Sequence, residues 1–277
     1  MGEGGADTQG PTEVIISADD FGLSVEVNEA VELAHREGIL STTSLMVAGP
    51  AAADAVRRAH ALPGLGVGLH LVAVEGPAVL GGQFGSDQVR LGFEYFFSPA
   101  ARRRLRAEIL AQYRAFAATG LRLDHANAHK HMHLHPTVGR MLIEIGCEFG
   151  LPALRIPAEP PDVMRACGHT PPLSAHALYG WAGVLRAQAR RAGLRTNDHV
   201  FGLAWSGGMT SERLLCLAGQ LPPGLSEIYF HPATDRTGVL QELMPEYDHA
   251  GELRTLLDKR VGAALERSAR LRNWGCA

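Results

Sequence analysis

The chain has 277 residues, of which 46% are hydrophobic and 20% are charged, which predicts a folded globular protein and excludes a disordered one. With a formal net charge of −3, the chain lacks the strongly basic character of nucleic-acid-binding proteins. No apolar run reaches the roughly 18 residues that span a bilayer. The four cysteines form no CxxC pair, which predicts free thiols in a reducing cytoplasm.

The opening segment MGEGGADTQGPTE has neither the basic region nor the apolar region of a signal peptide. We expect residues 1–12 to form a mobile tail. Because the remaining sequence contains no internal repeat and no low-complexity linker, we expect residues 13–277 to form a single domain.

Short apolar runs alternate with helical patterns along this domain. The predicted strands cover residues 14–16, 41–47, 65–69, 121–123, 153–156 and 226–230. The predicted helices cover residues 28–37, 51–61, 101–118, 136–149 and a closing segment over 251–271. This alternation predicts a mostly parallel sheet covered by helices. At this chain length, the expected fold is an α/β fold of the irregular (β/α) barrel type, similar to a distorted TIM barrel.

Residues with acid–base or metal-binding chemistry follow five of the predicted strands. They are Asp19 with Asp20, His70, the segment 124–129, Arg155 and His231. Because the carboxyl ends of parallel strands meet at one edge of the sheet, we expect these side chains to converge.

Two adjacent carboxylates in one pocket need a cation or a proton between them. We therefore expect one of Asp19 and Asp20 to bind a metal ion and the other to hold a proton. The alternative is that the pair caps a turn before Phe21. His231 is expected to act as a general acid, the alternative being a turn start at Pro232, and Arg155 is expected to orient a catalytic carboxylate, the alternative being a surface ion pair.

Histidine is the most unusual feature of the composition, with 13 in the chain and five between His125 and His135. On a strand, the histidines at 129, 131, 133 and 135 would share one face, and neutral imidazole is a favoured ligand of zinc-like ions. Since one ion cannot bind all four, we expect one or two to be ligands. The alternative is a solvated strand end. A single histidine such as His70, taken alone, is more often a hydrogen-bonded core histidine.

The segment SADDFG at 17–22, GLH at 68–70 and the HxHxH pattern at 129–133 together resemble the YdjC/ChbG family of carbohydrate deacetylases. The resemblance extends from about Val14 to the last predicted helix. Three further segments, 111–116, 123–136 and 155–160, most resemble the hopanoid-biosynthesis-associated branch of the family, HpnK. The resemblance implies an irregular barrel of the polysaccharide-deacetylase-like type.

The resemblance also implies one divalent metal ion held by an aspartate and two histidines, which match Asp20, His70 and His129. It implies that Asp19 is the catalytic base and that His231 is a further active-site residue. Two imidazoles and a carboxylate suit zinc better than magnesium by ligand softness, whereas the family resemblance implies magnesium, so both ions stay open.

Asn127 is a departure from the family pattern, because many members carry Asp-Ser where this chain carries Asn127-Ala128. The change removes a carboxylate near the metal ligands and is expected to alter how His129 is oriented. Since the HpnK branch shares the asparagine, we do not expect inactivation. We expect Asn127, His131 and His133 to contact the substrate or the metal ligands.

The implied activity is hydrolysis of the N-acetyl group of an amino sugar, with N-acetylglucosaminyl hopanoid lipid as the expected substrate. An aromatic segment, 93–97, is expected to form a loop, and a basic amphipathic stretch, 178–195, is expected to be helical. Both could touch a membrane, which would place a cytoplasmic protein at the inner membrane face. The alternatives are a loop packed on the barrel mouth and a solvated helix face.

Two other functions stay open: deacetylation of soluble chitooligosaccharides, and a non-catalytic metal- or sugar-binding barrel. A pure binding protein has no need of a second carboxylate, so Asp19 argues against the last of these. No nucleic-acid partner is expected, and a homodimer is left open.

Overall fold

A parallel sheet forms the centre of the computed structural model, which describes residues 11–236 and 238–275. Its strands are β1 (Thr12–Phe21), β2 (Thr42–Leu45), β3 (Gly66–Leu71), β6 (Leu123–Ala128), β7 (Ala153–Leu154), β8 (Arg195–Thr196), β9 (His199–Phe201), β10 (Gly224–Phe230) and β11 (Arg270–Arg272). The order is β8-β7-β6-β3-β2-β1-β10-β9, with β11 on β1, and every pairing in this sheet is parallel. A short hairpin, β4 (Gly76–Pro77) and β5 (Gln83–Phe84), stands apart.

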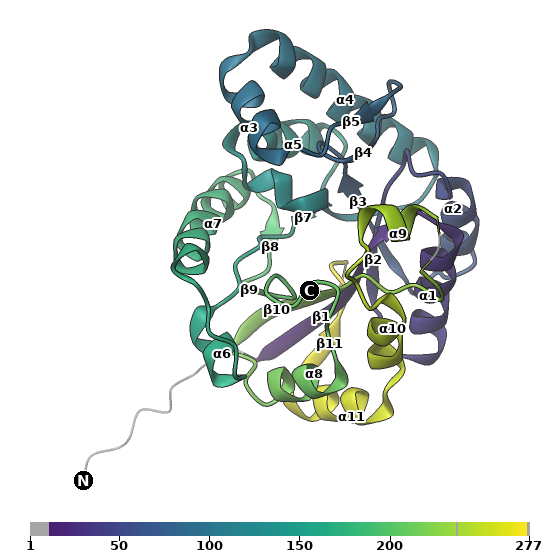
Figure 1. Ribbon diagram of the computed structural model, residues 1–277, viewed down its shortest axis with the longest axis vertical. Helices are drawn as coiled ribbons and strands as arrows, with labels where there is room; N and C mark the ends of the chain where they lie inside the picture. Colours follow the sequence, from purple (N-terminus) through teal and green to yellow (C-terminus); the bar gives the residue numbers. More distant parts are fainter. Residues whose placement is uncertain (1–10, 237, 276–277) are drawn as a thin grey trace.

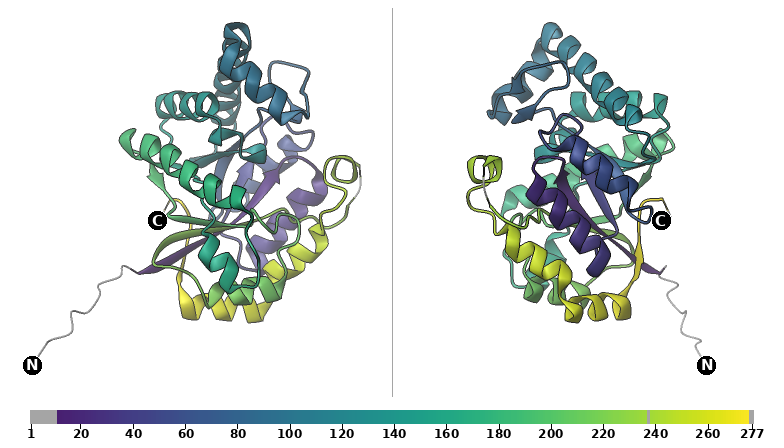
Figure 2. Two further views of the ribbon diagram at one scale, coloured as in Figure 1. Left: turned by 60° about the vertical axis from the view of Figure 1, so that its left-hand side comes forward. Right: turned by 90° about the vertical axis from the view of Figure 1, so that its right-hand side faces the viewer.

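Helices surround this sheet (Figure 1). They are α1 (Val25–Glu37), α2 (Ala52–His60), α3 (Gln88–Phe97), α4 (Pro99–Ala118), the 3-10 helix η1 (His129–Leu134), α5 (Pro136–Glu148), α6 (Pro161–Ala166), α7 (Leu173–Arg191), α8 (Ser211–Ala218), α9 (Val239–Leu243), α10 (His249–Leu257) and α11 (Lys259–Ser268). The sheet curls into a half-barrel, so the predicted α/β fold, a distorted TIM-like barrel, is confirmed. The segment carrying α9, which follows β10, projects from the body of the molecule (Figure 2).

The strand β1 lies at the heart of the core, between β2 and β10. Every residue from Val14 to Phe21 is buried, which is typical of a parallel strand covered on both faces. Near its beginning, Ile15 packs with Ala153 and the fully buried Trp274. Apolar packing fills the space around the start of β1, whereas the carboxylates of Asp19 and Asp20 lie near its other end.

A bulge near the end of β1 brings two carboxylates into one pocket. The pairing of β1 with β2 shifts register between Ala18 and Phe21, and Asp20 has a φ of 64°. A bulge inserts an extra residue and redirects a side chain that would otherwise point to the opposite face. Asp19 and Asp20 are both buried and both lie near His70, so the expectation that they share a pocket is confirmed.

The structure corrects the expected histidine strand. Residues 129–134 form η1, and Lys130 and His131 adopt left-handed backbone angles, with φ of 50° and 53°. The preceding strand instead runs from Leu123 to Ala128, so Asp124 and His125 lie inside it rather than after it. The histidines therefore do not share one strand face and each has different partners.

Two other expected elements differ. The segment 251–271 is not one helix, because the Asp258 side chain accepts a hydrogen bond from the Arg260 backbone N–H and starts a new helix, α11. Its last residues form β11 on β1. The aromatic segment 93–97 is the end of helix α3, whose start is capped by Asp87, and not a loop. The basic stretch 178–195 is helical up to Arg191, as predicted.

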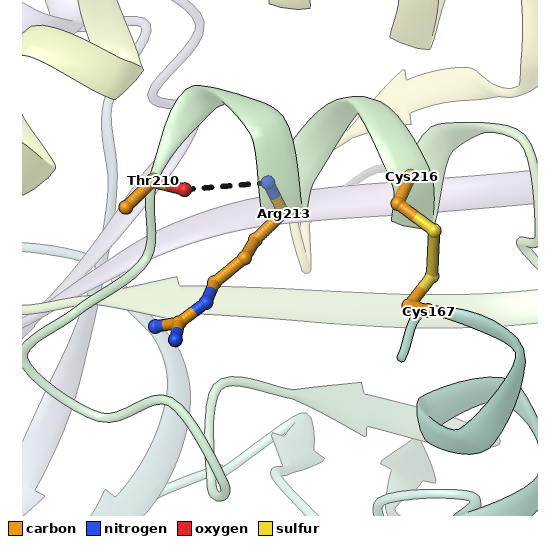
Figure 3. The surroundings of a disulfide bond; sticks show 4 residues. All are labelled: Cys167, Thr210, Arg213 and Cys216. Carbon is orange, nitrogen blue, oxygen red and sulfur yellow. Dashed lines mark hydrogen bonds between the residues drawn. A yellow bond between two sulfur atoms is a disulfide. The ribbon is translucent and has the colours of Figure 1, made fainter. Parts of the chain in front are cut away.

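The cysteine prediction is wrong for one pair. Cys167 and Cys216 form a disulfide with a Cα–Cα distance of 5.8 Å, because the end of α6 lies beside α8 (Figure 3). Disulfides persist mainly in oxidising compartments, so this pair removes the cysteine-based argument for a reducing cytoplasm. Cys147 is a free, exposed thiol, and Cys276 lies outside the described residues.

At the chain start, Thr12 already belongs to β1, so the expected tail is too long at that end, and residues 1–10 lie outside the described residues. Within the described residues, no helix combines the length and the apolar character needed to cross a membrane.

Candidate active site

Three predicted metal ligands meet at the carboxyl edge of the sheet. Asp20 comes from the end of β1, His70 from β3, and His129 from the first position after β6. His70 Nε2 and His129 Nδ1 each lie 3.3 Å from Asp20 Oδ1. One candidate ligand atom from each residue lies within 4.8 Å of the others, and all three residues are buried. Residues far apart in the chain thus form one cluster, as the sequence predicted.

The cluster has the properties of a cation site. Two ligands about 2.0–2.1 Å from one tetrahedral ion lie about 3.3–3.4 Å apart, which matches the separations between these atoms. Both carboxylate oxygens of Asp20 are buried without a hydrogen-bond partner. Buried polar atoms are rarely left unpaired, so these side chains fit a divalent metal ion.

Asn127 fixes the orientation of His70. Its amide oxygen lies 2.6 Å from His70 Nδ1, while its Nδ2 donates to Asp19 Oδ1 at 3.1 Å and to Ser44 Oγ at 2.9 Å. Since an amide oxygen only accepts, His70 Nδ1 carries a proton and, in the neutral ring, Nε2 keeps a lone pair toward Asp20. We expected Asn127 to affect the orientation of His129, but its hydrogen bond orients His70 instead.

Ionisation in the cluster also favours a cation. Burial alone raises the pKa of Asp20, but the neighbouring His129 and His70 outweigh it and hold this pKa well below its usual range. Burial lowers the pKa of His70, but the carboxylates of Asp19 and Asp20 outweigh burial and raise it. Positive charge is thus stabilised between these side chains.

Asp19 lies beside the cluster and is held by Arg155. Asp19 Oδ1 is 3.9 Å from His70 Nδ1, and Arg155 Nη1 donates to Asp19 Oδ2 at 2.6 Å. Burial raises the pKa of Asp19, but the Arg155 guanidinium and His70 lower it well below its usual range. Asp19 is therefore a charged, oriented carboxylate next to the candidate metal ligands.

Arg155 is fully buried and is itself held in place. Its Nε and Nη2 donate to the two carboxylate oxygens of Glu227 at 2.9 and 2.8 Å, and Nη2 also donates to Ser17 Oγ at 3.0 Å. The guanidinium carbon of Arg155 lies over the ring of Tyr229, 4.8 Å from the ring centroid. The surface ion pair considered as an alternative for Arg155 is excluded by this burial.

The other predicted histidines lie around this core. Tyr229 OH is 3.0 Å from His131 Nε2, and His133 Nε2 donates to the Arg155 carbonyl at 3.0 Å. The His231 ring packs 5.5 Å from the Tyr229 ring, and its buried Nδ1 has no hydrogen-bond partner. Burial lowers the pKa of His231, against the opposing effect of Asp20 and Asp19. A neutral His231 with a free ring nitrogen is available to a substrate.

Several residues around the site were missed in the sequence. Glu227 and Tyr229 alternate along β10 and so share one face of the strand, and the predicted His231 follows at the same spacing directly after it. A glutamate inside the apolar run SEIYF was a usable signal, because such residues are rarely fully buried unless paired. The backbone of His231 is held by Glu252, which accepts its N–H, and by His249 Nδ1, which donates to its carbonyl. The pattern gave no signal for Ser44, which links Asn127 to other buried polar groups.

Comparisons with known proteins find similar sequences over most of the chain. A protein-family model described as YdjC-like protein matches residues 13–267. A carbohydrate deacetylase from Thermoanaerobacter pseudethanolicus is 27% identical over 226 residues, which cover 79% of this chain and 80% of that protein. Carbohydrate deacetylases from Brevibacillus brevis and Vibrio vulnificus are 35% and 37% identical over 147 residues. These two alignments span 50% of this chain and 58% and 57% of the relatives.

Two solved structures share the fold. One, from Enterococcus faecalis, is described as a candidate cellobiose-phosphate cleavage protein and superimposes with a TM-score of 0.74 at 21% identity, over 95% of this chain and 98% of that one. The other, a lactam utilization protein from Thermus thermophilus, gives a TM-score of 0.53 at 18% identity, over 94% of this chain and 99% of that one. At these identities the likeness concerns the fold alone.

Proposed function

The chain belongs to the YdjC-like family, and from that premise we propose that it is a metal-dependent hydrolase that removes the N-acetyl group from an amino sugar. The observation that carries the proposal is the cluster of Asp20, His70 and His129 with a second carboxylate, Asp19, beside it. Relatives named as carbohydrate deacetylases support the choice of an acetylated sugar as substrate.

The metal ion in this proposal is held by Asp20, His70 and His129, and zinc and magnesium both stay open. Such an ion supplies Lewis acidity, which polarises the acetyl carbonyl and makes a water molecule easier to deprotonate. The protein provides the two imidazoles and the carboxylate, and Asn127 sets the protonation of His70 through its Nδ1.

Asp19 is the proposed general base. Its carboxylate stays ionised at neutral pH because Arg155 and His70 lower its pKa, so it is ready to accept the proton of the attacking water. Arg155, fixed by Glu227 and Ser17, is the proposed orienting residue. Holding the base in one position lowers the cost of reaching the reactive geometry.

His231 is the proposed general acid for the leaving amine: its neutral ring first takes up the proton that Asp19 removes from the water and then passes a proton to the amine nitrogen. Its Nδ1 is buried without a partner, so no existing hydrogen bond has to be broken before it contacts the substrate. Glu252 and His249 bind the backbone N–H and carbonyl of His231, which restricts where its ring can lie. His131, beside Tyr229, is a proposed substrate contact, whereas His133, which binds the Arg155 carbonyl, is a proposed support for Arg155.

The proposed substrate is an N-acetylglucosaminyl hopanoid lipid, on the sequence resemblance to the HpnK branch. The proposed cellular site is the cytoplasm, with peripheral contact to the inner membrane face. Phe93, Phe96 and Phe97 on α3 are 62%, 46% and 75% exposed and give this contact an apolar surface. Vesicle flotation tests it, since a protein that stays at the bottom of the gradient makes no such contact. The homodimer stays a prediction.

Deacetylation of soluble chitooligosaccharides is the alternative substrate assignment, supported by the general name carbohydrate deacetylase of the relatives. The remaining alternative is a non-catalytic metal- or sugar-binding barrel. It gives no role to Asp19, whose carboxylate is held in place by Arg155.

The direct test of the proposed activity measures acetate release by metal-loaded wild-type protein and by the Asp19→Asn variant. We expect the variant to bind metal normally and to lose at least about a hundredfold in turnover, as general-base removal typically does. Near-normal turnover in the variant would show that Asp19 is not the base. Acetate release from neither chitobiose nor a lipid-linked N-acetylglucosamine by the wild type would contradict the proposed function itself.

A further inference from the structure

A cavity of about 480 Å³ lies outside the cluster of metal ligands and is lined by residues between 157 and 204. Its volume falls within the range of about 300–1,000 Å³ that is usual for small-molecule sites. Nine of its 13 lining residues are apolar, including Pro157, Met164, Leu178 and Leu203. A lining of this kind is suited to an apolar group and offers few hydrogen bonds to a second sugar unit.

The cavity opens on the same edge of the sheet as the active site. Pro157 comes two residues after Arg155, at the end of β7, and Leu203 comes two residues after the last residue of β9. Because carboxyl ends of parallel strands share one edge, both walls belong to the edge that carries Asp20 and His70.

A short chain of contacts joins the two sites. The Gly202 N–H donates to Glu159 Oε1 at 3.0 Å, and Glu159 lines the cavity. A Cβ atom on Gly202 would lie 2.8 Å from the carbonyl oxygen of Tyr229, so these backbones touch. The Tyr229 ring in turn packs 5.5 Å from the His231 ring. The cavity is therefore separated from His231 only by Glu159, Gly202 and Tyr229, which are in contact with one another.

The carboxylate that lines the cavity is already hydrogen-bonded within the protein. Glu159 is its only Asp, Glu, Lys or Arg lining residue, and its carboxylate accepts the backbone N–H groups of Gly202, Leu203 and Ala204 at 3.0 Å each. It is therefore poorly placed to select a cationic ligand. The remaining surface decides what binds, and apart from His169, Ser174 and Tyr179 that surface is apolar.

The wall of the cavity is preformed. Four of its lining residues are prolines, at 157, 161, 171 and 172, whose φ angles are fixed. The segment between them is tied to α8 by the disulfide of Cys167 and Cys216 (Figure 3). A site that is ordered before binding pays little conformational entropy when an apolar group enters.

We propose that this cavity binds the apolar aglycone of the acetylated amino sugar, while the sugar itself lies at the metal-ligand cluster. The inference rests on the proposed deacetylase function. It predicts that substrates with an alkyl aglycone are preferred over substrates with a minimal one, and that the preference is set by the cavity walls.

The test compares octyl and methyl N-acetylglucosaminide as substrates of the full chain loaded with zinc, with acetate release as the readout. Each buried methylene strengthens binding about fourfold, so two or more seated methylenes should raise kcat/KM by about tenfold or more, through KM. Leu178→Asp, in the cavity wall on α7, should remove this gain and leave the methyl substrate unchanged. Val184→Asp, on the same helix but 48% exposed and outside the lining, is the matched control and should keep the gain.

Each other outcome is decisive. If both glycosides are hydrolysed equally well, or if chitobiose shows the gain instead, the apolar aglycone site is wrong while the deacetylase function stands. If no acetate is released from any substrate, the deacetylase function fails, and calorimetric titration with octyl N-acetylglucosaminide still tests the cavity. Binding that is lost in Leu178→Asp and kept in Val184→Asp supports the site, and equal binding by both variants overturns it.

Discussion

Replacing Arg155 with methionine should destabilise the protein by several kcal/mol. The guanidinium is fully buried and donates four hydrogen bonds, to Asp19, Glu227 and Ser17. Methionine fills much of the same space but leaves two buried carboxylates without their cation. Removing one partner of a buried ion pair costs about 3–5 kcal/mol, which in a protein of this size lowers Tm by roughly 6–20 °C.

The loss should also depend on pH. In the wild type, burial raises the pKa of Asp19 but Arg155 lowers it below its unfolded value of 3.8, so this contribution to stability is present above that pH and lost as pH falls through the folded pKa. Arg155 is the largest of the effects that lower the pKa of Asp19. Without it, the raising effect of burial should dominate and the pKa of Asp19 should rise above 3.8. The folded variant then binds a proton that the unfolded chain lacks, and its stability falls as pH rises. The loss should therefore be larger at pH 8 than at pH 5.

Urea unfolding in the presence of a metal chelator, at both pH values, measures this loss. Arg190→Met is the control, because Arg190 pairs with Asp198 at 2.9 Å with both side chains exposed, 54% and 40%. An exposed pair contributes at most about 1 kcal/mol. A loss below about 1 kcal/mol for Arg155→Met, or a larger loss at pH 5 than at pH 8, would refute the reasoning.

Two further predictions concern residues behind the site. Asn127→Ala should weaken metal affinity by about 10- to 100-fold in a chelator competition, because His70 Nδ1 loses its acceptor, and unchanged affinity would show that the ring is oriented by other contacts. Burial raises the pKa of Glu252 from 4.5 to about 7, so its neutral form contributes about 3 kcal/mol at low pH, and this is lost as pH rises toward and through 7. Glu252→Gln should flatten that part of the stability profile measured by urea unfolding, and an unaltered slope would contradict the assignment.

Much of the fold was readable in the sequence because buried parallel strands are short apolar runs, such as 14–16 and 226–230, followed by helical patterns. The carboxyl ends of parallel strands share one edge, which predicts that the residues following them converge, and the family resemblance then singles out Asp20, His70 and His129 among them. What failed depended on local backbone geometry. Periodicity cannot reveal left-handed residues, so the turn at Lys130 and His131 was read as a strand.

Long-range pairing was equally hidden. The disulfide of Cys167 with Cys216 joins residues 49 positions apart, and sequence spacing alone carries no information about such a contact. The bulge that brings Asp19 and Asp20 into one pocket is set by the register of β1 against β2. The second carboxylate partner of Arg155, Glu227, was not predicted because it lies within the mostly apolar run 226–230.

Metal content per chain is the most direct measurement of the central claim that Asp20, His70 and His129 hold one cation. After loading with zinc and desalting, elemental analysis should find about one ion per chain in the wild type and in His131→Ala, a histidine control from the same short helix. His70→Ala and His129→Ala should each lose most of it. Equal metal content in the His70→Ala variant and the wild type would contradict the account.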